Sequence, residues 1–322
     1  MTRRLLALLQ KENVGLALIL VVAMIALTIA NPAFLTAFNL YVVLVSIALW
    51  TCVALAQMVT LALGQMSLSI GAQGGLVAIV VGGLCELWGV PLPLAILAGL
   101  LVGAAGGLLN GILIATTGIN SFIITLATYS AFHGLTLGLT RAIPFYNMPE
   151  SLKAMGNARF GAVPWMLVVM LVIAAALHVI LTRMRIGRQI LAYGGNTQAA
   201  LLSGLSTRRV VIFAHVLSGL LVSVAAIFTV GRLQVAQPTI GEDWLIVSFA
   251  APIIGGASLT GGHVSVPGTL LALALLAVIN NALVLLRVDP FWVQVVLGCL
   301  TLAVVGANRF REGRRLDEAV AR

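Results

Sequence analysis

Charged residues are scarce in this sequence. Asp, Glu, Lys and Arg make up only 8% of its 322 residues, whereas about a quarter of a soluble globular domain is charged. Hydrophobic residues make up 61%, and the mean hydropathy is +1.13. Apolar runs of about 20 residues recur, and each is long enough to cross a bilayer as a helix. The scarcity of charge excludes a soluble protein, and the continuous runs argue against a membrane β-barrel.

Charge is scarcest inside the apolar runs themselves. No Asp, Glu, Lys or Arg lies near the middle of a predicted span. An ion-coupled carrier normally needs a buried carboxylate or cation for its coupling ion, although such a group costs about 3 kcal/mol at the bilayer centre. The absence therefore favours a transporter whose energy comes from another subunit. An ion-coupled secondary carrier whose ion site uses backbone carbonyls remains the alternative.

Sequence motifs of catalysis and of metal binding are also absent. There is no P-loop, GxSxG or HExxH pattern, so we expect neither ATP hydrolysis nor other enzyme activity from this chain. The three cysteines lack metal-ligand spacing, and so do the histidines. We expect no metal or other cofactor bound by this chain. His133, His178 and His215 lie in apolar runs, where hydrogen bonds between helices are the expected role.

The runs predict an all-α polytopic membrane protein, a single transmembrane domain over residues 1–322 with about ten helices. The predicted spans lie at 14–30, 40–63, 69–87, 92–117, 121–140, 163–182, 210–230, 244–259, 264–286 and 290–308.

The distribution of Lys and Arg predicts the orientation. Of the 18 basic residues, 13 fall before the first span, between the sixth and seventh spans, or after the tenth. Because basic loops stay in the cytoplasm, both termini and loop 183–209 are expected there. The net charge of +9 thus reflects membrane topology and not nucleic-acid binding. Loop 141–162 would lie outside, either as a docking surface for a soluble partner or as a connector.

The two halves of the chain show a weak internal similarity. A shift of 170 residues pairs Ile70-Gly71 with Ile240-Gly241 and places spans two to five on spans seven to ten. Five spans separate the two copies, so they would run in opposite directions. Transporters with such inverted repeats carry their substrate at the repeat interface. Chance similarity in a chain rich in Leu, Ala, Gly and Val is the alternative.

Each copy also holds a Gly-rich break, at 64–71 and 255–262. Irregular backbone at membrane depth is tolerated only where protein or a water-filled cavity covers it. The breaks therefore point to a substrate path, to which the repeat adds a pair of asparagines. The expected lining residues are Gln65, Ser67, Ser69, Asn110, Ser258, Thr260 and Asn280. The alternative for the amides is a role in helix–helix packing.

Four stretches of the sequence resemble the permease subunits of ribose-type ABC importers, a group that includes xylose, arabinose, galactose and autoinducer-2 permeases. They are 64–71 (GQMSLSIG), 107–134 (GLLNGILIA, NSFIITLAT and HG), 187–204 (GRQILAYGGN, AA and SG) and 250–269 (AAPIIGGASLTGG and PGT). The third and fourth stretches are the most specific, and the resemblance runs from about residue 40 to residue 308.

The resemblance implies the transmembrane subunit of an importer in the bacterial inner membrane. It implies a lipid-embedded dimer with a second permease copy or homologue, and a periplasmic binding protein that delivers a monosaccharide or similar small polar solute. Cytoplasmic ATP-binding cassette ATPases would hold the ATP and Mg. In that family, loop 183–209 carries the coupling helix, on which the ATPase pushes. The matching positions are Gly187, Arg188, Ala192, Gly194, Asn196, Ala199, Ala200 and Gly204.

Two positions depart from the pattern of that family. Ser67 stands where the first break usually has Asp, and Leu245 stands where the eighth span usually begins with Glu. Both departures remove a carboxylate near the expected path. They leave open a divergent sugar, a less polar ligand, or one half of a heterodimer.

Overall fold

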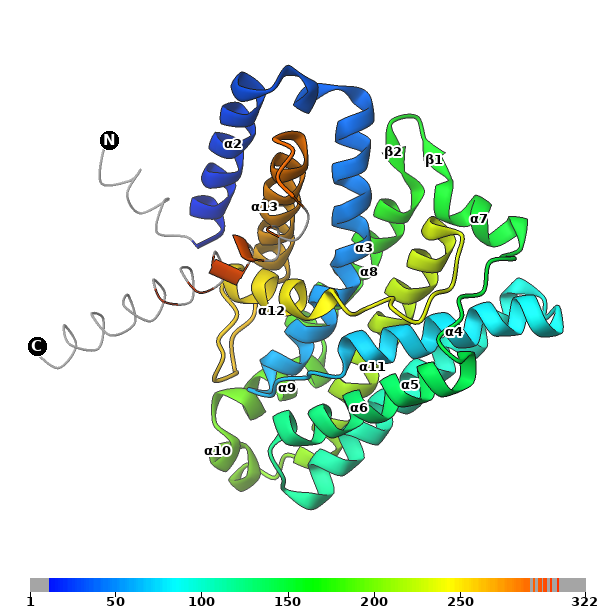
Figure 1. Ribbon diagram of the computed structural model, residues 1–322. Coiled ribbons are helices and arrows are strands. Elements are labelled where there is room, and N and C mark those ends of the chain that lie inside the picture. Colours follow the sequence, from blue (N-terminus) through cyan, green and yellow to red (C-terminus); the bar gives the residue numbers. More distant parts are fainter. Residues whose placement is uncertain are drawn as a thin grey trace, which may run out of the picture.

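The computed structural model describes residues 12–289 and, beyond them, only 292, 295, 296, 298, 299, 302 and 306. The tenth predicted span, 290–308, therefore lies outside the continuous described part. Helices make up most of this part, and a single hairpin supplies the strands found in it (Figure 1).

Nine helices of the described part follow the first nine predicted spans in order. They are α2 (Glu12–Ala30), α3 (Ala37–Ala62), α4 (Ile70–Trp88), α5 (Leu92–Thr117), α6 (Ser121–Thr140), α8 (Trp165–Arg183), α11 (Thr207–Leu233), α12 (Trp244–Ile254) and α13 (Val266–Leu285). Seven of them are long and apolar enough to cross a membrane, whereas the apolar parts of α2 and α12 are shorter.

Shorter elements connect these helices. They are η1 (Pro32–Leu35), α7 (Glu150–Asn157), β1 (Arg159–Phe160), β2 (Val163–Pro164), α9 (Arg185–Gly195) and α10 (Thr197–Leu202). Loop 141–162 contains α7, followed by the β1–β2 hairpin. Helices α9 and α10 lie at the opposite end of the molecule from α7 and this hairpin (Figure 1).

The eighth predicted span, 244–259, ends earlier than expected. Helix α12 is only 11 residues long and contains Pro252, which cannot donate a helical hydrogen bond. The chain then turns at Gly255 and Gly256, and Gly256 has φ of +90°, a conformation that favours glycine. A side chain on Gly255 would lie 2.5 Å from the backbone nitrogen of Thr269. The close approach of α13 therefore ends the helix where only glycine fits.

Helices α3 and α11 form the centre of the bundle. In each, 67% of the apolar span is buried, compared with 28% in α5 and α6. Helix α11 packs against α3, α4 and α5, while α3 also packs against α8, α12 and α13. Helix α6 packs against α4 and α5 and leaves its other face free in the described chain. That free face is available to lipid or to another subunit.

Two loops meet on α4 at the end that carries α7. The backbones of Phe145 and Ala236 exchange hydrogen bonds of 2.8 and 2.9 Å, which joins loop 141–149 to loop 234–243. Phe145 lies over Gly82 and Gly83 of α4, whose missing side chains leave room for its ring. The backbone of loop 234–243 is thereby held in place beside α4 and α6.

Candidate functional site

The first Gly-rich break, between α3 and α4, is held in place by polar side chains from its neighbours. The backbone nitrogens of Met66 and Leu68 donate to Ser121 Oγ and Thr125 Oγ1 of α6, at 3.3 and 3.1 Å. Gln57 of α3, with its amide turned to satisfy both groups, donates to the Ser67 carbonyl at 2.9 Å and accepts from its nitrogen at 3.2 Å. The irregular backbone is therefore satisfied inside the protein, as membrane depth requires.

The side chains of this break join a buried polar cluster. Asn110 of α5 donates through Nδ2 to Ser69 Oγ at 2.9 Å and accepts from Thr128 Oγ1 at 2.7 Å. The hydroxyl oxygens of Ser67 and Ser69 lie 3.3 Å apart. Ser67, Ser69 and Asn110 are at most 3% exposed. The structure thus brings together three predicted path residues, and their hydrogen bonds tie the break to α5 and α6. A role in lining a path stays a prediction.

Gln65 links this break to two other parts of the molecule. Its Oε1 lies 2.9 Å from His215 Nε2 on α11, and its side chain also hydrogen-bonds to the phenol of Tyr193 on α9. Burial raises the pKa of Tyr193, and the contact with Gln65 opposes that shift. The phenol therefore stays protonated near neutral pH, and its oxygen accepts the hydrogen bond from the Gln65 amide. Tyr193, Gln65 and His215 form a hydrogen-bonded chain, which we call the Gln65 chain.

The predicted coupling loop consists of the two short helices α9 and α10. Gly187 packs directly on the backbone of Ile180 and Leu181, so α9 folds back tightly against α8. Asn196 caps α10, because its Oδ1 accepts from the nitrogen of Ala199 at 2.9 Å. Arg188 Nη1 donates to the carbonyl of Arg183 at 2.9 Å. Asn196 therefore caps α10, and Arg188 ties α9 to the end of α8.

The other predicted coupling residues divide by exposure. Ala200 is buried and anchors α10, whereas Ala192, Ala199 and Gly204 face outward. Gly204 follows α10 with φ of +75° and so ends the loop in a conformation typical of glycine.

Backbone contacts join the coupling loop to both breaks. Residues 194–195 of α9 lie against Ala62 at the end of α3 and against residues 261–262 of the second break, which also touches Gly64 of the first break, and we call this contact the glycine junction. The nitrogen of Gly262 donates to the carbonyl of Ala62 at 3.0 Å. A side chain on Gly194 would fall 2.6 Å from the nitrogen of Gly262, and one on Gly64 would fall 2.6 Å from the carbonyl oxygen of Thr260. Three segments therefore touch without intervening side chains.

The remaining predicted path residues lie apart from the buried cluster. Ser258 and Thr260 share a hydrogen bond of 2.8 Å between their hydroxyls in the exposed turn of the second break. Asn280 is half-buried on α13 and makes no side-chain hydrogen bond within the described chain. Its neighbour Asn281 exchanges hydrogen bonds of 2.9 and 2.7 Å with Asn39 of α3. This amide pair joins the two helices, which is the alternative role considered for the amides.

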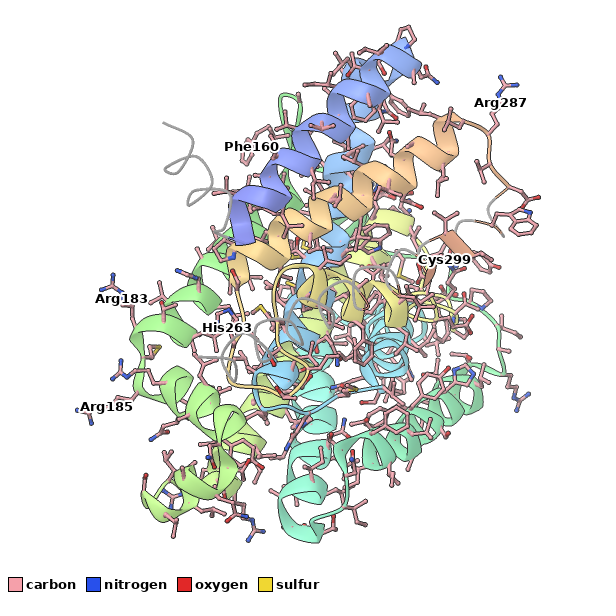
Figure 2. The ribbon with its side chains drawn as sticks, turned by 90° about the vertical axis from the view of Figure 1, so that its left-hand side faces the viewer. Phe160, Arg183, Arg185, His263, Arg287 and Cys299 are labelled. Atoms are coloured by element: carbon pink, nitrogen blue, oxygen red, sulfur yellow. The ribbon has the colours of Figure 1, made fainter. Side chains whose placement is uncertain are left out.

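The sequence interpretation missed two exposed leucines on α10. Leu202 is 89% exposed and Leu201 is 49% exposed. The signal was present, since two leucines in succession are unusual in a polar, basic loop. Arg183 and Arg185 project from the same end of the molecule, at the left of Figure 2.

The chain matches known transport proteins along most of its length. Residues 39–305 match the family described as the permease component of the branched-chain amino acid transport system. The chain is 35% identical to the ribose import permease protein RbsC of Bacillus subtilis, over 92% of this chain and 93% of that protein. It is 31% identical to the D-allose transport system permease protein AlsC of Escherichia coli, over 86% and 85%.

The fold also has a solved counterpart. An inward-facing structure of a metal-chelate type ABC transporter superposes with a TM-score of 0.56, at 17% identity, over 94% of this chain and 99% of that one. At this identity the likeness concerns the fold alone. The match over residues 39–305 and the relatives above 30% identity decide the family. The chain belongs to the permease family of ABC importers, whose members are the membrane subunits and not the ATPases.

Proposed function

We propose that this chain passes a monosaccharide, or a polar solute of similar size, from a periplasmic binding protein to the cytoplasm. The names of the relatives, which include ribose, allose and arabinose permeases, support a sugar. The observation that carries the proposal is the glycine junction, because it connects the coupling loop directly to both broken segments. Energy delivered at the loop by an ATPase can thereby reach the path.

The surface offered to the ATPase is the outer side of α9 and α10. Leu202 at 89% exposure is costly in water and gains about 1.5–3 kcal/mol when a partner covers it. Ala199 and Gly204 beside it allow close approach, and the Asn196 cap keeps α10 formed. ATP and Mg then belong to the partner, and this chain needs no cofactor.

The proposed orientation places α9 and α10 in the bacterial cytoplasm, together with both termini. Arg183, Arg185 and Arg188 are exposed at that end, which follows the positive-inside rule. Helix α7 and the β1–β2 hairpin then face the periplasm, where the binding protein docks.

Contacts between the halves support the inverted repeat. Gly71 and Gly241, which the shift of 170 residues pairs, lie backbone to backbone, as expected for counterparts beside a twofold axis. Gly64 and Gln234, another such pair, both have φ in the left-handed region, at 72° and 61°. Helix α3 packs against α12, while its counterpart α11 packs against α4. A tenth helix over 290–308 would complete the second copy.

The path is proposed to run beside the two breaks. Gln65, Ser67, Ser69 and Asn110 would support its wall on one side, while Ser258, Thr260 and Asn280 belong to the second copy of the repeat. The free face of α6 leaves room for a second permease copy or homologue, so the path would be completed at the dimer interface.

Reconstitution tests the proposed function. Liposomes containing this chain, its ATPase and its binding protein should take up labelled ribose, allose or arabinose only when ATP is enclosed on the ATPase side. Leucine serves as the comparison solute, because the family description names amino acids. Uptake of leucine but of no sugar would overturn the sugar proposal. Uptake driven by an ion gradient without ATP would overturn the importer mechanism.

A further inference from the structure

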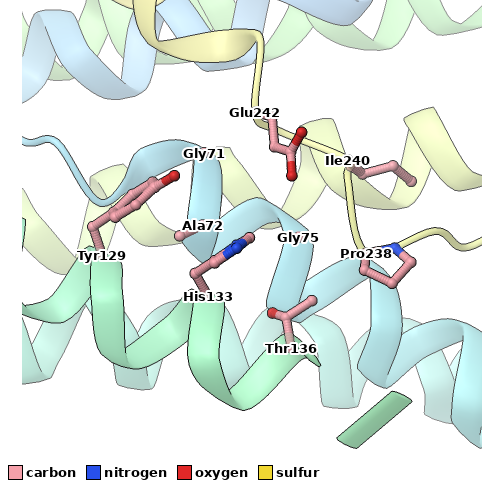
Figure 3. Close-up of a pocket in the computed structure, with 9 residues that line it drawn as sticks. All are labelled: Gly71, Ala72, Gly75, Tyr129, His133, Thr136, Pro238, Ile240 and Glu242. Carbon is pink, nitrogen blue, oxygen red and sulfur yellow. The ribbon is translucent and has the colours of Figure 1, made fainter. Parts of the chain in front are cut away.

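A small cavity lies between α4, α6 and loop 234–243. It has room for about one water molecule, and it is lined by Gly71, Ala72, Gly75, Tyr129, His133, Thr136, Pro238, Ile240 and Glu242 (Figure 3). The α4 side is almost bare, because two glycines and an alanine form it. Polar groups come from the other two sides: Tyr129, His133 and Thr136 from α6, and Glu242 from the loop.

The two aromatic rings are stacked. The rings of Tyr129 and His133 are one helical turn apart on α6, with centroids 5.9 Å apart and planes only 8° from parallel. The Glu242 carboxylate points from the loop toward them across the cavity (Figure 3). An apolar flat face opposite a carboxylate matches a sugar ring, which has an apolar C–H face and hydroxyl donors on its rim.

These polar groups lie at a depth where they need partners. Tyr129 and His133 are near the middle of α6, so they do not belong to an aromatic belt at the membrane surface. Within the described residues, the side chains of Tyr129, His133 and Glu242 make no hydrogen bond. A phenol and an imidazole facing lipid would be costly, so this side of α6 faces water or a solute.

The position of the cavity agrees with a place on the path. It adjoins the contact of Gly71 with Gly241, where the two halves of the chain meet. In this state it admits about one water molecule, so a larger solute requires that loop 234–243 and α6 separate. The loop departs from α11 at Gln234, whose φ of 61° is unusual for a residue with a side chain.

We infer that Tyr129, His133 and Glu242 form a sugar subsite on the path, which the solute reaches from the periplasmic side. The sugar ring stacks on the aromatic pair, and Glu242 accepts hydrogen bonds from its hydroxyls. This inference rests on the proposed function.

The test uses the complete importer in liposomes with labelled ribose, allose and arabinose as probes. His133→Ala, Tyr129→Ala and Glu242→Gln should each lower uptake of the transported sugar about tenfold or more. The matched control is His178→Ala, whose side chain lies outside the cavity. The amount of ATPase that co-purifies with each variant should equal that of the unmodified chain, which shows that they assemble.

A second measurement does not depend on transport. A cysteine placed at 133, in a chain without Cys52, Cys85 and Cys299, should react with a methanethiosulfonate reagent. Saturating sugar-loaded binding protein should slow that reaction, whereas empty binding protein should not. Normal uptake by the cavity variants overturns the subsite while the proposed function stands. Disulfide formation between two copies at 133, without protection by sugar, would instead assign the cavity to a subunit contact. Absence of sugar uptake by the unmodified importer would reject the proposed function itself.

Discussion

Alanine at Gly194 is expected to uncouple the ATPase from the path, whereas alanine at the adjacent Gly195 should be tolerated. A Cβ at Gly194 would lie 2.6 Å from the nitrogen of Gly262 and 3.0 Å from the carbonyl carbon of Ala62. Both are backbone atoms and cannot turn aside. At Gly195 the nearest atom is the Cα of Gly262 at 3.8 Å, an ordinary contact. The two substitutions add the same methyl group to neighbouring positions and differ only in what it meets.

The size of the effect follows from this overlap. Forcing a methyl group into a packed site costs about 1–3 kcal/mol, which changes an equilibrium about 5- to 150-fold. The strain is relieved when α9 moves away from Ala62 and Gly262. The arrangement in which a push on the loop moves the breaks then becomes less populated by a similar factor.

Three measurements on the same preparations check this prediction. Membrane insertion of Gly194→Ala should equal that of Gly195→Ala in a fractionation assay. Sugar uptake and the stimulation of ATPase activity by loaded binding protein should both fall at least fivefold in Gly194→Ala alone. Equal uptake by the two variants would refute the claim that the glycine junction transmits the movement.

Three further predictions concern the loop and its connections. Leu202→Ser should lower the amount of ATPase that co-purifies with this chain about tenfold, because the partner loses about 1.5–3 kcal/mol of apolar contact. The control is Leu139→Ser, on an exposed face of α6, and equal co-purification of the two variants would exclude Leu202 from the interface. Asn196→Ala should weaken ATPase binding, because α10 loses about 1 kcal/mol of stabilisation from its N-terminal cap. Asn196→Asp should restore binding, since Asp caps a helix equally well. If Asp does not restore it, Asn196 touches the partner itself. Gln65→Leu should lower sugar uptake while leaving ATPase binding intact, because it breaks the Gln65 chain at its centre. The double variant with Tyr193→Phe should lose little more uptake than Gln65→Leu alone, whereas additive losses would show that the two residues act separately.

The positions of the membrane spans were predictable because they depend on apolar composition along the chain. Apolar runs located the first nine helices within a few residues, except where α12 ends at Ile254 before the Gly-rich turn. Hydropathy carries no signal for that stop, since 255–257 are as small and apolar as a packed helix. It depends on the approach of α13 to Gly255, which is a tertiary contact.

The site was predictable in part. The breaks and the loop stood out by their glycines. The glycine junction was not foreseeable. It joins Ala62, Gly194 and Gly261, which are far apart in the sequence, through contacts between backbone atoms. The cavity was missed because Tyr129 and His133 lie within an ordinary apolar span, and only folding brings Glu242 opposite them.

The glycine junction also bears on how such a permease can change its solute. A contact made of backbone offers no side chain whose gradual replacement could adjust it, so substitutions there are tolerated or they fail. The side chains that line the cavity, and those at positions such as Ser67 and Leu245, can be substituted independently of one another. Selectivity can therefore diverge among relatives that carry ribose, allose or arabinose names while the transmission of force stays the same.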